Sequence, residues 1–155
     1  MNQLVHKSMF LAAIVCFSLV SFSCKKKGCT SKLAENYSAK AKKDDGSCTF
    51  ARTKFIGSYA TSQSCVFADP ETFVLAVSNG PNDNEIMLGN FGNMGISIRA
   101  QVTGSDISFK EEQAGIVYEG TGYLTGNSIT INYEACESYY YPCTDPESCT
   151  MTGSK

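Results

Sequence analysis

The chain has 155 residues with a formal net charge of −2, which is room for one compact domain and a short appendage. Beyond the first 23 positions it holds 12 basic and 15 acidic side chains, and it therefore lacks the basic surface that nucleic-acid binding usually requires. The one histidine, His6, lies in that leading stretch, so the remainder has no Ser/His/Asp or Cys/His triad, and GxxxxGK[ST] and HExxH motifs are missing.

The leading segment has the anatomy of an export signal. Residues 1–7 are polar and positively charged, and an apolar run of 12 residues at positions 9–20 precedes the small-residue stretch at 21–23. A transmembrane helix needs about 20 apolar residues, and lysines follow at 25–27. We therefore expect residues 1–23 to be a signal peptide and not a stable membrane span.

The stretch from Val20 to Cys24, VSFSC, resembles the lipobox of bacterial lipoproteins, in which small residues precede a cysteine that is diacylated and becomes the new N-terminus. Ser21 departs from the leucine that is usual at its position. The resemblance implies a protein anchored at Cys24, because two or three acyl chains hold a protein at a membrane where one is marginal. The alternative is ordinary secretion with a free Cys24 thiol.

Residues 24–27 form the expected tether, and its three lysines are either solvated or bind acidic headgroups. The lipoproteins that this chain resembles follow a sorting rule in some bacteria: those displayed at the cell surface carry acidic residues just after the anchored cysteine. This chain has none there. This favours an outer-membrane lipoprotein on the periplasmic side over one at the cell surface.

Residues 28–49 form a module bracketed by Cys29 and Cys48, which we expect to form a disulfide in an oxidising compartment. It resembles a module of exported Gram-negative proteins that reads roughly GCTDPxAxNYxPxAxxDDGSC. Asp44, Asp45 and Asn36 carry oxygens that could bind calcium, but their spacing does not fit an EF-hand. We prefer a turn at Asp45-Gly46 with solvated aspartates and expect no cofactor.

Residues 50–155 alternate apolar and polar side chains in short runs, as Ile129, Ile131 and Tyr133 illustrate. This pattern, with glycine-bearing linkers of hairpin length, predicts an all-β antiparallel meander of about eight strands. The expected strands are 54–61, 72–78, 85–90, 96–102, 107–113, 116–124, 128–134 and 148–153. We favour a closed barrel over a curled sheet, because closure removes exposed edges.

The stretch from Phe55 to Tyr59, FIGSY, resembles the first lipocalin motif without its usual tryptophan. Small lipocalin-like lipoprotein domains share further features with this chain: the segment Asn90-Phe91-Gly92, the strand Gly120-Thr121-Gly122, and a cysteine in the last strand. The resemblance implies a barrel but says little about its function.

Apart from Cys16 and Cys24, six cysteines remain, an even number that fits three disulfides. With Cys29 paired to Cys48, the other four allow three connectivities. A closed meander brings its first and last strands together, which favours Cys65–Cys149 and leaves Cys136–Cys143 to bracket its own loop. No CxxC occurs, so we do not expect these cysteines to bind metal.

The loop inside that last bracket carries Tyr139, Tyr140 and Tyr141, and exposed aromatic residues are frequent contact hot spots. The same tyrosines could instead form a lid over the barrel end. Without histidine or a catalytic constellation, we expect a non-catalytic binding or structural module that contacts a protein or glycan. The alternative is a lipocalin-type carrier with a small ligand in its lumen, which we disfavour because the inward residues are large.

Overall fold

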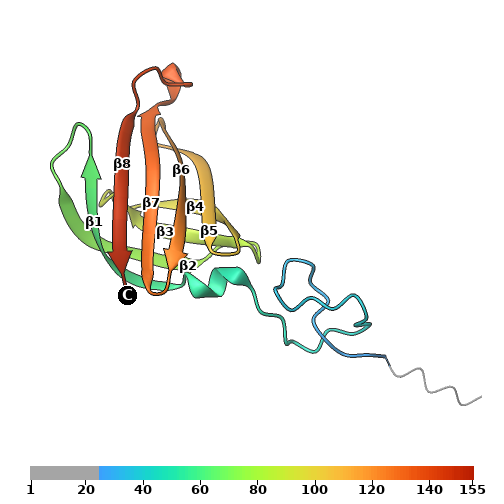
Figure 1. Cartoon of the computed structure of the whole chain (residues 1–155). Helices are drawn as coiled ribbons and strands as arrows, with labels where there is room; N and C mark the ends of the chain where they lie inside the picture. The colour runs from blue at the N-terminus through green and yellow to red at the C-terminus, as the bar shows by residue number, and fades with distance from the viewer. Residues whose placement is uncertain (1–24) are drawn as a thin grey trace, which may run out of the picture.

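The computed structural model describes residues 25–155 (Figure 1), so the expected signal peptide and Cys24 lie outside the described residues. In chain order the elements are η1 (Ala51–Lys54), β1 (Gly57–Cys65), β2 (Glu71–Asn79), β3 (Glu85–Phe91), β4 (Ile96–Thr103), β5 (Asp106–Gln113), β6 (Ile116–Thr125), β7 (Ser128–Glu137), η2 (Ser138–Tyr140) and β8 (Glu147–Ser154). From residue 25 onward, no helix has both the length and the apolar character to cross a membrane.

The strands form one closed antiparallel barrel in which sequence neighbours pair and β1 also pairs with β8. Tight turns dictate this order. At Ala114-Gly115, for example, both residues have positive φ (51° and 81°), the backbone that a two-residue hairpin turn requires. The predicted all-β meander is confirmed, and it closes as a barrel.

One seam of the barrel is held partly by side chains. β4 and β5 pair from Gln101–Ser108 to Thr103–Asp106 and then diverge. Beyond that point, the Glu111 carboxylate accepts a hydrogen bond from the backbone N–H of Arg99 (3.0 Å), and the Gln113 amide donates to a backbone carbonyl of β4 (3.4 Å). These side chains satisfy backbone groups that would otherwise lack a ladder partner.

The first strand differs from the prediction, which placed it at 54–61. Residues Ala51–Lys54 form the 3-10 helix η1, and β1 runs from Gly57 to Cys65, so that Cys65 lies inside the strand. The short helix turns the chain so that Phe55 enters the barrel, where it is fully buried. β7 also runs further than predicted and includes Cys136, whereas the other strands match within one residue at each end.

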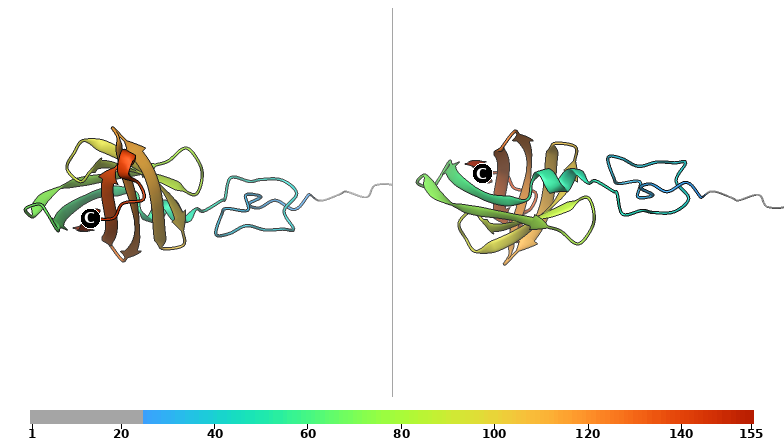
Figure 2. Two further views of the ribbon diagram at one scale, coloured as in Figure 1. Left: turned by 90° about the horizontal axis from the view of Figure 1, so that it is seen from above. Right: turned by 90° about the horizontal axis from the view of Figure 1, so that it is seen from below.

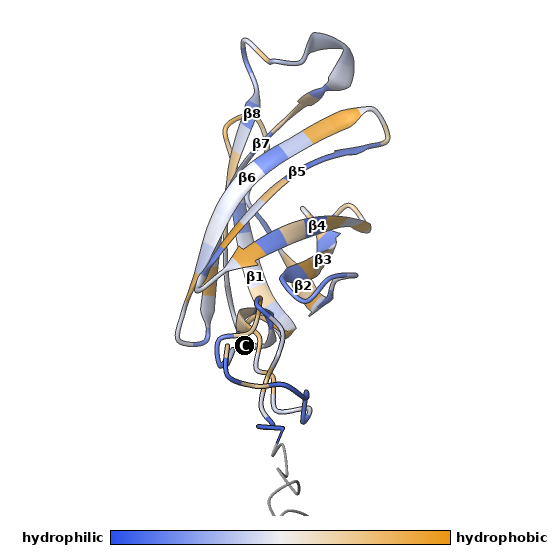
Figure 3. Cartoon of the chain, turned by 90° about the vertical axis from the view of Figure 1, so that its right-hand side faces the viewer, coloured by the Kyte–Doolittle hydropathy of each residue, from blue (hydrophilic) through white to orange (hydrophobic). Residues whose placement is uncertain are grey.

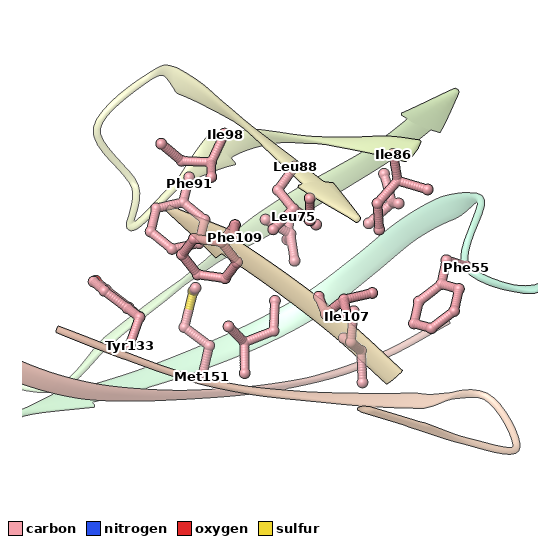
Figure 4. Packing of buried hydrophobic residues seen from close by; sticks show 14 of the residues in the cluster. Phe55, Leu75, Ile86, Leu88, Phe91, Ile98, Ile107, Phe109, Tyr133 and Met151 are labelled. Atoms are coloured by element: carbon pink, nitrogen blue, oxygen red, sulfur yellow. The ribbon is translucent and has the colours of Figure 1, made fainter. Parts of the chain in front are cut away.

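Apolar side chains fill the barrel interior from end to end (Figure 4). Phe55 lies at one end beside Ile107 and Ile86, and Phe91 and Phe109 lie toward the other. The Phe91 ring packs edge-on against the Phe109 ring with centroids 5.4 Å apart, a preferred geometry for aromatic pairs. Hydrophilic and hydrophobic residues alternate in bands along β4 and β6 (Figure 3), as half-buried strands require.

The two ends of the barrel are distinguished by the direction of the chain. At the proximal end β1 begins and β8 ends, and the Lys155 ammonium donates to the carbonyls of Lys54 (2.7 Å) and Ile56 (2.9 Å). The views from above and below place the C-terminus beside η1 (Figure 2). Because the chain direction alternates from strand to strand, every odd-numbered strand ends at the opposite, distal end. The β1–β2, β3–β4, β5–β6 and β7–β8 loops therefore all lie there.

Three disulfides link the six cysteines of the described chain: Cys29–Cys48, Cys65–Cys149 and Cys136–Cys143. Cys65 and Cys149 face each other directly across the β1–β8 ladder, with Cα atoms 4.1 Å apart. This bond joins the strands that close the barrel, as the meander topology led us to expect. Cys136–Cys143 ties the end of β7 to the following loop.

Candidate contact surfaces

The distal loops carry a set of exposed apolar and aromatic side chains that we call the distal rim: Val66, Phe67, Met94, Tyr139 and Tyr140. Tyr139 is 89% exposed, Phe67 67% and Val66 66%. The proximal loops at 80–84, 104–105 and 126–127 consist of glycine, proline, asparagine, aspartate and serine. Exposed apolar side chains that share one region often mark a contact surface. Of the exposed large apolar residues on the barrel, Val74 and Tyr123 lie on the wall, and the others lie in the distal loops.

Of the three tyrosines in the β7–β8 loop, Tyr141 is an anchor that stays partly exposed (40%), and the other two are more exposed. The Tyr141 hydroxyl donates to the Glu119 carboxylate on β6 (2.7 Å) and accepts from the Lys110 ammonium on β5. The same ammonium lies 4.1 Å from the centroid of the Tyr141 ring and 3.1 Å from the Glu119 carboxylate. Tyr141 therefore holds the loop against the outer wall of the barrel.

The charges of this anchor stabilise one another. The Tyr141 hydroxyl and, after it, the Lys110 ammonium lower the pKa of Glu119 below its ordinary value. Hydrogen bonds from the Lys110 ammonium to Tyr141 and then to Glu119 raise the pKa of the lysine. Glu119 and Lys110 are consequently both charged at neutral pH.

Tyr139 and Tyr140 project from the anchored loop instead of packing on the barrel. Tyr140 is 66% exposed, and the two rings contact each other edge to face with centroids 5.2 Å apart. The predicted site of three equivalent tyrosines is thus divided: two are available for contact, and Tyr141 positions them. As an exposed pair of touching rings they resemble a contact surface more than a lid.

A second candidate surface is a hollow of about 960 Å³ on the outer wall, which we call the polar groove. Its floor is a ladder of directly opposed, outward-facing side chains that crosses six strands from β4 through β8 to β1. The members of the ladder are Gln101, Ser108, Thr121, Asn132, Thr150 and Ser64. Lys110 and Glu119 of the tyrosine anchor border the groove on its distal side, together with Glu134.

Two glycines of β6, Gly120 and Gly122, face the barrel interior behind the polar groove. A Cβ on Gly120 would lie 2.5 Å from the Asn132 carbonyl oxygen and 2.7 Å from the Phe109 ring, and Gly122 is similarly crowded. β6 can therefore bend inward only because these inward positions lack side chains. Thr121, between them, lies on the floor of the groove. Gly120-Thr121-Gly122 therefore lies where the backbone is closely packed on the inner face and polar on the outer face.

The lumen contains large side chains at the positions that a carrier would need to leave open. Near the distal end the Tyr133 hydroxyl donates to the Gln63 side chain (3.1 Å), and its ring packs on Phe91 with centroids 4.7 Å apart. Burial raises the pKa of Tyr133 to about 12, so the phenol is neutral at physiological pH.

The oxygens considered for calcium serve as turn caps in the module. Asp44 accepts from the Gly46 backbone N–H (2.7 Å) and the Thr30 hydroxyl (2.9 Å), and Asp45 accepts from the Ser47 N–H (3.1 Å). Hydrogen bonds lower the pKa of both aspartates. For Asp44 the main cause is the bond from the Gly46 backbone, and for Asp45 it is the Ser47 side chain, followed by the Ser47 backbone. The side-chain oxygen of Asn36 likewise accepts from the Thr49 backbone N–H (2.9 Å). The arrangement fits the expected Asp45-Gly46 turn.

Within residues 25–155, one group of possible metal-ligating atoms lies close together, namely those of Cys65, Glu147 and Cys149, within 4.8 Å of one another. Both sulfurs belong to a disulfide. A disulfide lacks the thiolate that binds metal, so this group acts as a structural link.

Comparison with known proteins yields a fold-level likeness alone. No family model and no curated protein matches the sequence significantly. A solved structure described as a redesigned β-barrel aligns with 68% of this chain and 94% of its own, at a TM-score of 0.48 and 9% identity.

Sequence reasoning did not find the polar groove, Val66 or Phe67. The outward Ser, Thr and Asn residues have the alternation of any solvated strand face, and only the pairing register shows that they form one continuous ladder. A signal for Val66-Phe67 was present, because two adjacent apolar residues interrupt a polar stretch just after a predicted strand.

Proposed function

We propose that this protein is a lipid-anchored envelope lipoprotein whose lipocalin-like barrel is a non-catalytic module for contact with a protein or glycan partner. The observation that carries the proposal is the distal rim, where five large exposed side chains lie in three loops opposite the chain entry. Aromatic residues and methionine are enriched at the buried centres of protein interfaces, which makes the rim the first candidate for contact.

The direction of the chain supports this orientation. The tether and module lead into η1 at the proximal end, so an acylated Cys24 would attach the barrel to the membrane at that end. The distal rim would then face away from the anchoring membrane, where a partner in the envelope can reach it. We place the protein at the outer membrane, with its barrel on the periplasmic side.

Two features favour contact over catalysis or carriage. The part of the chain that forms the module and barrel contains no histidine, and carboxylates such as Asp44, Glu111 and Glu119 serve in a turn cap or in ion pairs. The barrel interior is occupied by buried aromatic and branched side chains. Mass spectrometry of the native protein should accordingly show the mass of the lipoprotein alone, and a retained small apolar molecule would favour the carrier.

The rim proposal is tested by cross-linking in intact cells that express the full chain. We expect Tyr139→Ser combined with Tyr140→Ser to reduce the yield of the main cross-linked partner by about tenfold or more, since central aromatic contacts contribute roughly 2 kcal/mol or more each. Tyr123→Ser is the matched control, because Tyr123 is also an exposed tyrosine (46%) but lies on the barrel wall. Identical partners and yields in all three proteins would contradict a contact role for the rim.

The anchor is tested separately by partitioning between detergent and water. We expect the wild-type protein to enter the detergent phase and Cys24→Ala to enter the aqueous phase, because loss of the acylated cysteine removes the membrane attachment. Cys16→Ala, in the expected signal peptide, should partition as wild type. If Cys24→Ala stays in the detergent phase, the protein is attached by another route.

A further inference from the structure

We propose that the polar groove binds an uncharged glycan. This rests on the proposed function, because it names the ligand class of one surface of the contact module. The groove lies beside the tyrosine anchor and extends along the outer wall at right angles to the strands.

The length of the groove suits a chain-like ligand. Its ladder crosses six of the eight strands of the closed barrel, and strands lie about 4.8 Å apart, so the ladder follows the curved outer wall for roughly 24 Å. The six ladder side chains are all hydroxyls or amides: Gln101, Ser108, Thr121, Asn132, Thr150 and Ser64. The amide of Gln101, at one end, is already engaged with Asn84 (2.7 Å) and Glu85 (2.6 Å), so the other five side chains are the ones left for a ligand. Such groups both donate and accept hydrogen bonds, as the hydroxyls of a glycan do.

One bond within the ladder orients it toward a ligand. The Thr150 hydroxyl donates to the Asn132 side-chain oxygen (2.9 Å), which fixes the orientation of the amide group. The NH₂ group of the Asn132 amide donates to no acceptor among residues 25–155. Its two hydrogens therefore remain available to a ligand oxygen. Thr121, opposite Asn132 in the ladder, adds a hydroxyl directly beside this amide.

The charges at the border exclude anionic ligands. Lys110 is paired with Glu119 at 3.1 Å, and Glu134 lies next to Glu119 in the ladder register. One cation therefore faces two carboxylates, a balance that repels nucleic acids and acidic polysaccharides. A protein partner fits the groove less well than it fits the rim, because serine is depleted at interfaces and aromatic residues are enriched.

The shape of the groove is built into the backbone. Behind the groove, Gly120 and Gly122 face the barrel interior, where a Cβ on either would lie 2.5 Å from a backbone oxygen of β7. A hollow formed by paired strands is present before the ligand arrives, so binding orders few groups and its entropic cost is small.

The test is electrophoresis of the purified full chain through gels that contain dextran, laminarin, mannan or xylan, with alginate as an acidic comparison. We expect at least one neutral polysaccharide to retard the wild-type protein, and alginate not to. In Thr121→Val with Thr150→Val, the affinity should fall by about tenfold or more, because two hydrogen bonds of roughly 1 kcal/mol each are lost without a change in shape.

The matched control is Thr72→Val with Thr125→Val, which changes two exposed threonines outside the groove and should bind within about twofold of wild type. Urea unfolding verifies that both double variants are folded. The Tyr139→Ser and Tyr140→Ser rim variant should keep its affinity for polysaccharide, so the two proposals fail independently. Retardation by none of the neutral polysaccharides, retardation by alginate alone, or equal loss in the control would each overturn the glycan site.

Discussion

Gly120 and Thr121 serve the two faces of β6. Gly120 faces inward, where a Cβ would collide with the Asn132 carbonyl oxygen and the Phe109 ring, and Thr121 faces outward onto the floor of the polar groove. The position of Gly120 is therefore set by close approach of the backbone rather than by a turn. At the scale of single residues, one missing side chain shapes both the core and the outer surface.

We expect Gly120→Ala to lower the free energy of unfolding by about 1 to 3 kcal/mol, because the added methyl meets a backbone atom that cannot move without shifting β7. Urea denaturation followed by circular dichroism measures the change. Thr121→Ala, at the neighbouring exposed position, should shift the free energy by less than about 0.5 kcal/mol. Equal effects of the two substitutions would show that β6 is free to relax at Gly120.

The β7–β8 loop is held by three kinds of contact. The Cys136–Cys143 disulfide closes it, the Tyr141 hydroxyl bonds to Glu119, and the Lys110 ammonium lies over the Tyr141 ring. Exposed ion pairs contribute little to global stability, so this set acts locally. Its role is to hold the segment that carries the two exposed tyrosines in one position.

The anchor should depend on pH with a definite sign. The folded pKa of Glu119 is below its ordinary 4.5, so the contribution of this carboxylate is present above pH 4.5 and is lost as the pH falls through the lowered value. The ring resonances of Tyr141 in NMR spectra should therefore shift in that acidic range. In Glu119→Gln this transition should be missing, whereas Glu112→Gln, at an exposed residue outside the anchor, should keep it. An unchanged transition in Glu119→Gln would assign it to another group.

The whole barrel depends on a contact between its first and last strands. β1 and β8 pair over six residue pairs, from Ala60–Ser154 to Cys65–Cys149, and the disulfide lies at the distal end of that ladder. The paired cysteines are separated by 84 positions in sequence. The bond therefore restricts most of the barrel chain in the unfolded state.

We expect Cys65→Ser with Cys149→Ser to lower the free energy of unfolding of the barrel by about 4 to 5 kcal/mol in the chain-entropy model. The matched control is Cys29→Ser with Cys48→Ser, because the Cys29–Cys48 disulfide lies in the module and contributes nothing to the barrel core. That control should leave the urea midpoint of the barrel unchanged. A similar loss in both variants would mean that module and barrel unfold as one unit.

The sequence by itself determined the local features of this protein. Alternation such as Ile129, Ile131 and Tyr133 predicted strands because one face of a strand must be buried, and glycine-bearing linkers of hairpin length predicted that neighbouring strands pair. The spacing of the six cysteines became interpretable once a meander was assumed. The Asp45-Gly46 turn depends on neighbours close in sequence, and it too was predicted.

Only the tertiary structure decided the features that depend on distant segments. Phe55 lies in the barrel because η1 turns the chain at the proximal end, a bend that no strand pattern predicted. Tyr141 differs from Tyr139 because Lys110 and Glu119 come from two other strands. The polar groove requires the register of six strands at once. Each of these depends on contacts between residues far apart in the chain, which local periodicity does not encode.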